Sequence, residues 1–105
     1  MNELAVYECR KYTIQIFKWL KSRYSDNLYD FIVLEDDEII SIKIKMNTTI
    51  KFYEKRGQGI INYIIKTFKY PQYLKINWRY NHNMFEINVF CGQKSQEIYM
   101  SDNEK

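Results

Sequence analysis

Two pairs of short segments that alternate apolar and polar side chains constrain the fold of this chain most strongly. Residues 73–80 and 85–91 flank Asn81-His82-Asn83-Met84, which reads as a tight turn. Side chains on a strand alternate between its two faces, so a wrong register would mix apolar with polar residues. The expected pairs are Ile76 with Val89, Trp78 with Ile87 and Tyr80 with Phe85, while Arg79 meets Glu86 on the reverse face. This pattern predicts an antiparallel hairpin with one buried face.

Residues 28–34 and 39–46 predict a second hairpin of the same kind. A turn at Asp36-Asp37 gives the pairs Val33 with Ile40, Phe31 with Ile42 and Tyr29 with Ile44, and it places Asp30 opposite Lys43. An ion pair across two strands would support this register. Residues 50–54 and 97–100 are candidates for further short strands.

Two segments carry apolar residues at helical spacing. Residues 3–24 predict a long amphipathic helix, with a short strand at 4–9 and a helix from residue 13 as the alternative. Residues 58–69 predict a second helix, which should end at Tyr70 because Pro71 disfavours helical backbone in the residue before it.

These elements predict one α+β domain over residues 1–100, followed by a flexible tail at 101–105. With 3 Gly and 1 Pro in 105 residues, most of the chain should be regular structure with short turns. The expected architecture has two layers: a mainly antiparallel sheet of about five strands, covered by the long N-terminal helix and the shorter second helix. The expected order is α-ββ(β)-α-ββ(β).

The cysteines and the apolar runs indicate a cytoplasmic protein. Cys9 and Cys91 lie 82 positions apart without a CxxC motif, which favours two reduced thiols in a reducing compartment over a long-range disulfide. The first residues lack the basic start and apolar run of a signal peptide. No stretch approaches the roughly 20 apolar residues of a membrane helix, so no membrane association is expected.

Charge is unevenly distributed along the chain. The net charge is +3, yet residues 28–41 carry five acidic groups and residues 42–79 carry nine basic groups against Glu54 alone. A basic block attracts nucleic acid or the acidic surface of another protein, or it serves only as a solvated face.

The outward sides of the predicted strands would gather several of these cations on one surface. We expect the anionic partner to contact Lys43, Lys45, Lys51, Lys55, Arg56, Lys75 and Arg79. Such cations supply affinity for phosphates without reading base sequence. Tyr53 and Tyr73 could add base stacking. The sequence leaves the partner's identity open, and self-association into a homodimer is compatible with it.

A glycine-containing segment before the second predicted helix suggests a phosphate loop. Gly57, Gln58 and Gly59 follow Lys55 and Arg56. Glycines at a helix N-terminus let an anion approach free backbone N–H groups. The alternative is an ordinary turn that opens the helix, and the Gly-Lys-Ser/Thr of a Walker loop is absent.

This segment resembles the pyrophosphate loop of the GNAT acetyltransferase family, Arg/Gln-x-x-Gly-x-Gly/Ala. Arg56 and Gly59 match its first two fixed positions, and Ile61 stands where the family has a small residue. Asn81 and Gly92 loosely match later positions, so the resemblance covers about residues 30–93. It implies an N-acetyltransferase that uses acetyl-CoA and the Arg56-Gly57-Gln58-Gly59 loop.

The remaining chemistry-bearing residues favour no catalytic or metal site. His82, the single histidine, lies in a predicted turn, and the acidic run 35–38 lacks the spacing of an EF-hand. The sequence therefore favours a small non-enzymatic binding or regulatory protein without a cofactor. Its composition suits an accessory or inhibitor protein of a phage or mobile element, and the acetyltransferase is the alternative.

Overall fold

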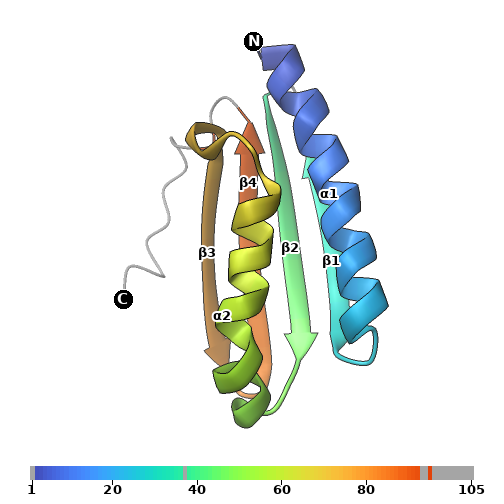
Figure 1. Ribbon diagram of the computed structural model, residues 1–105, viewed down its shortest axis with the longest axis vertical. Helices are drawn as coiled ribbons and strands as arrows, with labels where there is room; N and C mark the ends of the chain where they lie inside the picture. The colour runs from blue at the N-terminus through green and yellow to red at the C-terminus, as the bar shows by residue number, and fades with distance from the viewer. Residues whose placement is uncertain (1, 37, 93–94, 96–105) are drawn as a thin grey trace.

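The computed structural model describes residues 2–36, 38–92 and 95, and side chains from Val6 onward. Its elements follow the order α-β-β-α-β-β, with a short 3-10 helix before the third strand (Figure 1). They are α1 (Asn2–Tyr24), β1 (Leu28–Glu35), β2 (Ile39–Asn47), α2 (Ile50–Thr67), η1 (Pro71–Tyr73), β3 (Leu74–Asn81) and β4 (Met84–Gly92).

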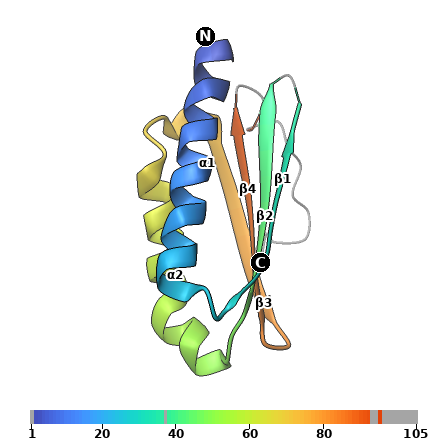
Figure 2. The same ribbon diagram turned by 90° about the vertical axis from the view of Figure 1, so that its right-hand side faces the viewer.

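The four strands form one antiparallel sheet in the order β1-β2-β4-β3. Figure 2 shows both helices on one side of this sheet and no described helix on the other. The core lies between the two layers, where alternate side chains of the central strands β2 and β4 are fully buried. They are Ile40, Ile42, Ile44, Met46, Phe85, Ile87, Val89 and Cys91. The predicted α+β class and two-layer antiparallel architecture are confirmed.

The hairpin of β3 and β4 has the register that its alternation predicts. Ile76 pairs with Val89, Trp78 with Ile87 and Tyr80 with Phe85, and Arg79 faces Glu86. Its turn contains His82 and Asn83 at φ 51° and 63°. Positive φ at two successive residues marks the type I′ turn, whose twist matches that of the flanking strands. His82 is therefore an exposed turn residue, as predicted.

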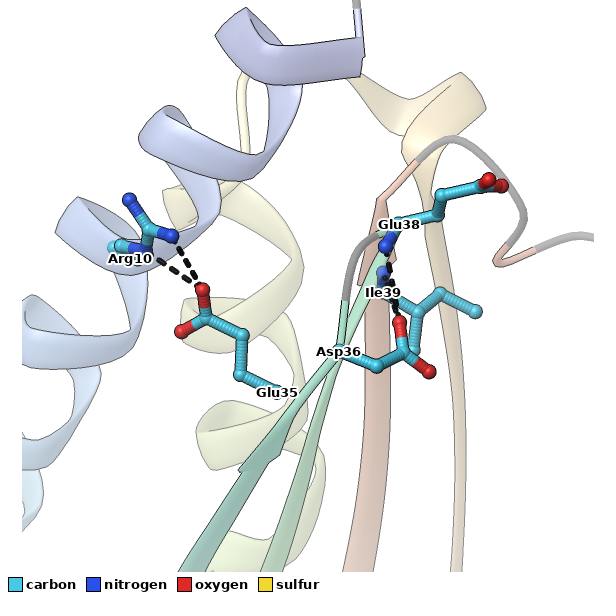
Figure 3. Close-up of polar contacts among 5 residues, drawn as sticks. All are labelled: Arg10, Glu35, Asp36, Glu38 and Ile39. Atoms are coloured by element: carbon cyan, nitrogen blue, oxygen red, sulfur yellow. Dashed lines mark hydrogen bonds and ion pairs between the residues drawn. The ribbon is translucent and has the colours of Figure 1, made fainter.

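The predicted register of the first hairpin is wrong by two residues. Val33 pairs with Ile42 rather than Ile40, and Asp30 pairs with Lys45 rather than Lys43. The Asp36 carboxylate accepts hydrogen bonds from the backbone N–H groups of Glu38 and Ile39, at 2.9 and 3.0 Å (Figure 3). The Asp36 backbone N–H also donates to the Ile39 carbonyl at 3.0 Å, so the turn is displaced by one residue from the predicted Asp36-Asp37 position. Because two residues are one full period of a strand, Ile40, Ile42 and Ile44 of β2 still face the core. Tyr29 lies at an irregularity in the register and is 64% exposed.

The N-terminal helix is confirmed, and the alternative of a strand at 4–9 is wrong. A disulfide joins Cys9 of α1 to Cys91 of β4, with 5.9 Å between their Cα atoms. The prediction of two reduced thiols is therefore also wrong. Both residues belong to the core stripe of their element and are almost fully buried, at 1% and 2% exposure, so folding brings them together across the layers.

The second helix begins eight residues earlier than predicted, and the expected strand at 50–54 is its first turn and a half. Thr49 caps the N-terminus: its Oγ1 accepts a hydrogen bond from the Phe52 backbone N–H at 3.1 Å. The helix ends at Thr67, short of Pro71 as expected. The described sheet therefore has four strands rather than about five.

The predicted strand at 97–100 and the predicted tail at 101–105 lie outside the described residues. Neither described helix is long and apolar enough to span a membrane.

Candidate anion-binding surface

Most of the positive charge of the described chain lies on the two helices. Residues 6–24 and 50–69, here called the helix layer, contain ten basic and two acidic side chains, the acidic ones being Glu8 and Glu54. All ten basic side chains are exposed: Arg10, Lys11, Lys18, Lys21, Arg23, Lys51, Lys55, Arg56, Lys66 and Lys69. Such an excess of one sign produces a positive potential over this layer.

Few of these cations are neutralised by a neighbouring carboxylate. Arg10 donates hydrogen bonds to the Glu35 carboxylate, one of them from Nε at 2.9 Å (Figure 3). Lys11 lies 3.6 Å from Glu8. The other eight basic residues of the helix layer form no ion pair within the described part of the chain. They are available to an external anion.

The Arg10–Glu35 pair also changes the titration of both groups. Hydrogen bonding from the guanidinium lowers the pKa of Glu35, and the same contact raises the pKa of Arg10. The pair joins α1 to the end of β1 and therefore has a structural role.

The seam between α1 and α2 combines aromatic and basic groups. The rings of Trp19 and Tyr63 stack at a centroid distance of 3.8 Å, and the Arg23 guanidinium lies 5.9 Å from the Trp19 ring. Beside the stack, a shallow notch is lined by Gln15, Tyr63, Lys66 and Thr67. Trp19 and Trp78 are partly buried and pack against the core.

The seven cations predicted to form one surface are divided between opposite sides of the molecule. Three lie on α2: Lys51, Lys55 and Arg56. The other four lie on β2 and β3, at positions that alternate with the core residues and face away from the helices: Lys43, Lys45, Lys75 and Arg79. Because the fold separates residues 43–45 and 75–79 from 51–56, the basic block of the sequence is not one surface.

The cations of the open sheet face are also partly compensated. Glu86 on β4 lies between two strands that carry them, at 3.8 Å from the Lys43 Nζ and 3.3 Å from the Arg79 Nη2. The Glu86 side chain is only 14% exposed, and Lys45 is its direct partner on β2. This face is therefore less attractive to an anion than the helix layer.

The predicted glycine loop is wrong, because Gly57, Gln58 and Gly59 lie inside α2. Backbone N–H groups within a helix are already hydrogen bonded and cannot hold a phosphate. Gly57 is buried, and a Cβ there would lie 2.9 Å from the Tyr53 ring, so this glycine permits close packing. Gly59 is exposed with no atom near its Cβ position.

The same placement removes the geometric basis of the GNAT resemblance. Arg56 and Gly59 occupy one turn in the middle of a helix, whereas the family's motif lies between a strand and a helix. Asn81 and Gly92 end strands β3 and β4. Tyr53, expected to stack on bases, instead stacks on the ring of Tyr80, with the ring centroids 4.6 Å apart.

The open sheet face carries a hollow of about 450 Å³ at the end near the β1–β2 turn. Its lining is mixed, with apolar Ile32, Leu34, Ile42 and Phe90 beside polar Ser41, Lys43 and Asn88. No group of three or more potential metal ligands occurs among the described residues.

The chain is 55% identical over 95 residues to Uncharacterized protein 101 of Sulfolobus islandicus rod-shaped virus 1, and the match covers 90% of each protein. The chain belongs to the family of this viral protein. This viral relative supports the expected origin in a phage or mobile element. No protein-family model matches the chain, and no solved structure matches it significantly.

Sequence reasoning missed the basic residues of α1 and the C-terminal half of α2 as members of the surface. Lys18, Lys21 and Arg23 were hidden because Glu3, Glu8 and Asp26 reduce the net charge of residues 1–27 to +2. Charge counted around the helix, rather than along the chain, would have placed these cations outside the apolar stripe.

Proposed function

We propose that this viral-family protein is a non-enzymatic binding protein that engages nucleic acid through its helix layer. One observation carries the proposal: ten exposed basic side chains share this layer with two acidic ones, and eight of the ten form no ion pair within the described residues. Contacts between cations and phosphates supply most of the affinity in sequence-independent binding.

The distribution of the charges favours a linear polyanion over a compact acidic group. Lys51, Lys55 and Lys66 are spread along α2, and the first and last are separated by about 22 Å at the usual helical rise of about 1.5 Å per residue. Lys18 and Lys21 extend the same layer across α1. Phosphates recur at short intervals along a nucleic acid, so several could be contacted at once.

The proposal is tested by comparing two charge reversals of equal size on opposite faces. Lys55→Glu with Lys66→Glu changes the helix layer, while Lys45→Glu with Lys75→Glu changes the open sheet face. Binding to a fluorescent 30-base-pair duplex is measured by anisotropy over a series of salt concentrations, with thermal melts as a control for folding. Both variants lose the same net charge, so a difference reports the location of the surface.

We expect the helix-layer variant to lose at least about ten times more affinity than the sheet variant. Wild-type affinity should fall as salt rises, with a slope that reflects about 0.9 released ions per phosphate contact. Equal losses in the two variants, or affinity independent of salt, would contradict the proposal. Polyglutamate that competes as well as the duplex would instead indicate an acidic protein surface as the partner.

A further inference from the structure

The two edge strands of the sheet differ in how they are protected against pairing with another chain. β3 carries Lys75 and Arg79 on its open face, and edge lysines and arginines discourage further strand addition. β1 presents large apolar side chains instead: Tyr29 is 64% and Leu34 is 67% exposed. An exposed apolar edge strand with free backbone groups is a template for strand pairing.

The exposed apolar side chains of the described chain gather on the β1 side of the molecule. Ten large apolar side chains are exposed among the residues that the structure describes, and seven of them belong to α1 or β1. These seven are Tyr7, Ile14, Phe17, Tyr29, Ile32, Val33 and Leu34. Such a patch on a soluble protein marks an interaction surface.

We propose that β1 pairs antiparallel with β1 of a second copy, about a two-fold axis that passes Ile32. An antiparallel edge is self-complementary, because a two-fold axis brings the same residues of both copies together. Ile32 and Val33 point to opposite faces of the sheet and are each 42% exposed, so a partner strand must be apolar on both faces. β1 of a second copy meets that requirement.

Charge disfavours the neighbouring register that is centred on Val33. With the axis at Ile32, Asp30 lies opposite Leu34 of the second copy, and Phe31 lies opposite its Val33. Moving the axis by one residue, to Val33, would place Asp30 directly opposite Asp36 of the second copy. Like charges in directly opposed positions destabilise a strand pair.

The proposed pairing would also bring the two α1 helices together. Antiparallel continuation of a sheet about a two-fold axis keeps the same face upward, so both helix layers would lie on one side. Phe17 of α1 packs edge-on against Phe31 at a ring distance of 4.9 Å and is 38% exposed, which places it beside the interface. The dimer would present two basic layers as one surface, although the pairing itself does not depend on nucleic-acid binding.

A single introduced cysteine tests the register in the full chain without nucleic acid. The two native cysteines form the disulfide, so Ile32→Cys would supply the single free thiol. Directly opposed strand residues have Cβ atoms about 5 Å apart, close enough for oxidation to link the copies. Ile65→Cys, at an exposed apolar position of α2 with 41% exposure, is the matched control.

We expect mild oxidation at micromolar protein concentration to convert most of the Ile32→Cys protein into a covalent dimer on a non-reducing gel, at least about ten times faster than Ile65→Cys. Leu34→Cys should also react slowly, because its equivalent in the second copy lies four residues away along the strand. Equal rates at all three positions would overturn the proposal.

Sedimentation equilibrium gives an independent measurement. The wild type should show twice the monomer mass of 13.0 kDa at tens of micromolar. Ile32→Lys with Leu34→Lys should weaken the dimer at least about tenfold, while Ile65→Lys should leave it unchanged, with circular dichroism as the control for folding. A wild type that is monomeric throughout this range would overturn the proposal, as would an Ile65→Lys effect of equal size.

Discussion

The two helices cover the same face of the sheet but are held there by different interactions. α1 is joined to β4 by the Cys9–Cys91 disulfide and to β1 by Arg10 and Glu35. α2 has no covalent link and approaches the sheet through Gly57, next to the aromatic group formed by Tyr53, Tyr80 and Phe85. Comparable helices can therefore be fixed by a cross-link on one side and by close packing on the other.

Among the changes that test this difference between the helices, removing the disulfide should lower the free energy of unfolding most. A disulfide that closes a loop of this length stabilises a protein by about 4 kcal/mol, largely by restricting the unfolded chain. We expect Cys9→Ala with Cys91→Ala to lower the free energy of unfolding by about that amount in urea denaturation. A loss below about 1 kcal/mol would show that packing alone holds α1, as it holds α2.

Adding a methyl group at Gly57 should produce the next largest effect. A Cβ at this position would lie 2.9 Å from Tyr53 Cδ1 and 3.7 Å from Phe85 Cζ, and stacking on Tyr80 prevents the Tyr53 ring from moving freely. We expect Gly57→Ala to destabilise the protein by about 1–2 kcal/mol, since overpacking outweighs the gain in helix propensity. Thermal unfolding followed by circular dichroism measures this change, and a rise in stability would contradict the close-packing argument.

Gly59→Ala is the matched control and should have the opposite sign. It lies on the same helix, and no atom is within 4 Å of its Cβ position. Replacing an exposed helical glycine with alanine stabilises by about 0.5–1 kcal/mol. The same thermal measurement applies, and destabilisation here would mean that glycine at this position contributes something other than helix geometry.

The ion pair that links α1 to β1 should produce the smallest effect, and it should depend on pH. The folded-state pKa of Glu35 is lowered by Arg10, so the pair contributes stability above the ordinary glutamate pKa of about 4.3. That contribution is lost as the pH falls through the lowered folded value. We expect Arg10→Ala to shift the pKa of Glu35 back up in an NMR titration, and an unchanged pKa would show that the pair is not formed in solution.

The same contrast between the helices explains how far the sequence predicts the fold. The apolar stripe of α1 runs unbroken by glycine or proline, so its helix is predicted over nearly its full length. In α2, Gly57 and Gly59 suggested a loop, and the first eight residues of the helix were missed. Glycine allows both loops and close helix packing. The choice here depends on packing against Phe85, which is distant from Gly57 in the sequence and comes close to it only when the chain folds.

The registers of the two hairpins and the arrangement of the basic residues were predictable from the sequence to different degrees. The β3–β4 register follows from local alternation around a two-residue turn, whereas the β1–β2 register depends on hydrogen bonds from backbone N–H groups to the Asp36 side chain. The basic residues were identified, but their division between two faces could not be read along the chain. The Cys9–Cys91 contact is likewise a product of how α1 packs on β4.

The disulfide turns most of the polypeptide into a closed ring. Only residues before Cys9 and after Cys91 lie outside it. One proteolytic cut anywhere inside the ring therefore leaves both fragments attached to each other, and they separate only after reduction. A nicked molecule would run as a single species under non-reducing conditions. Its two fragments would stay covalently linked while the protein refolds.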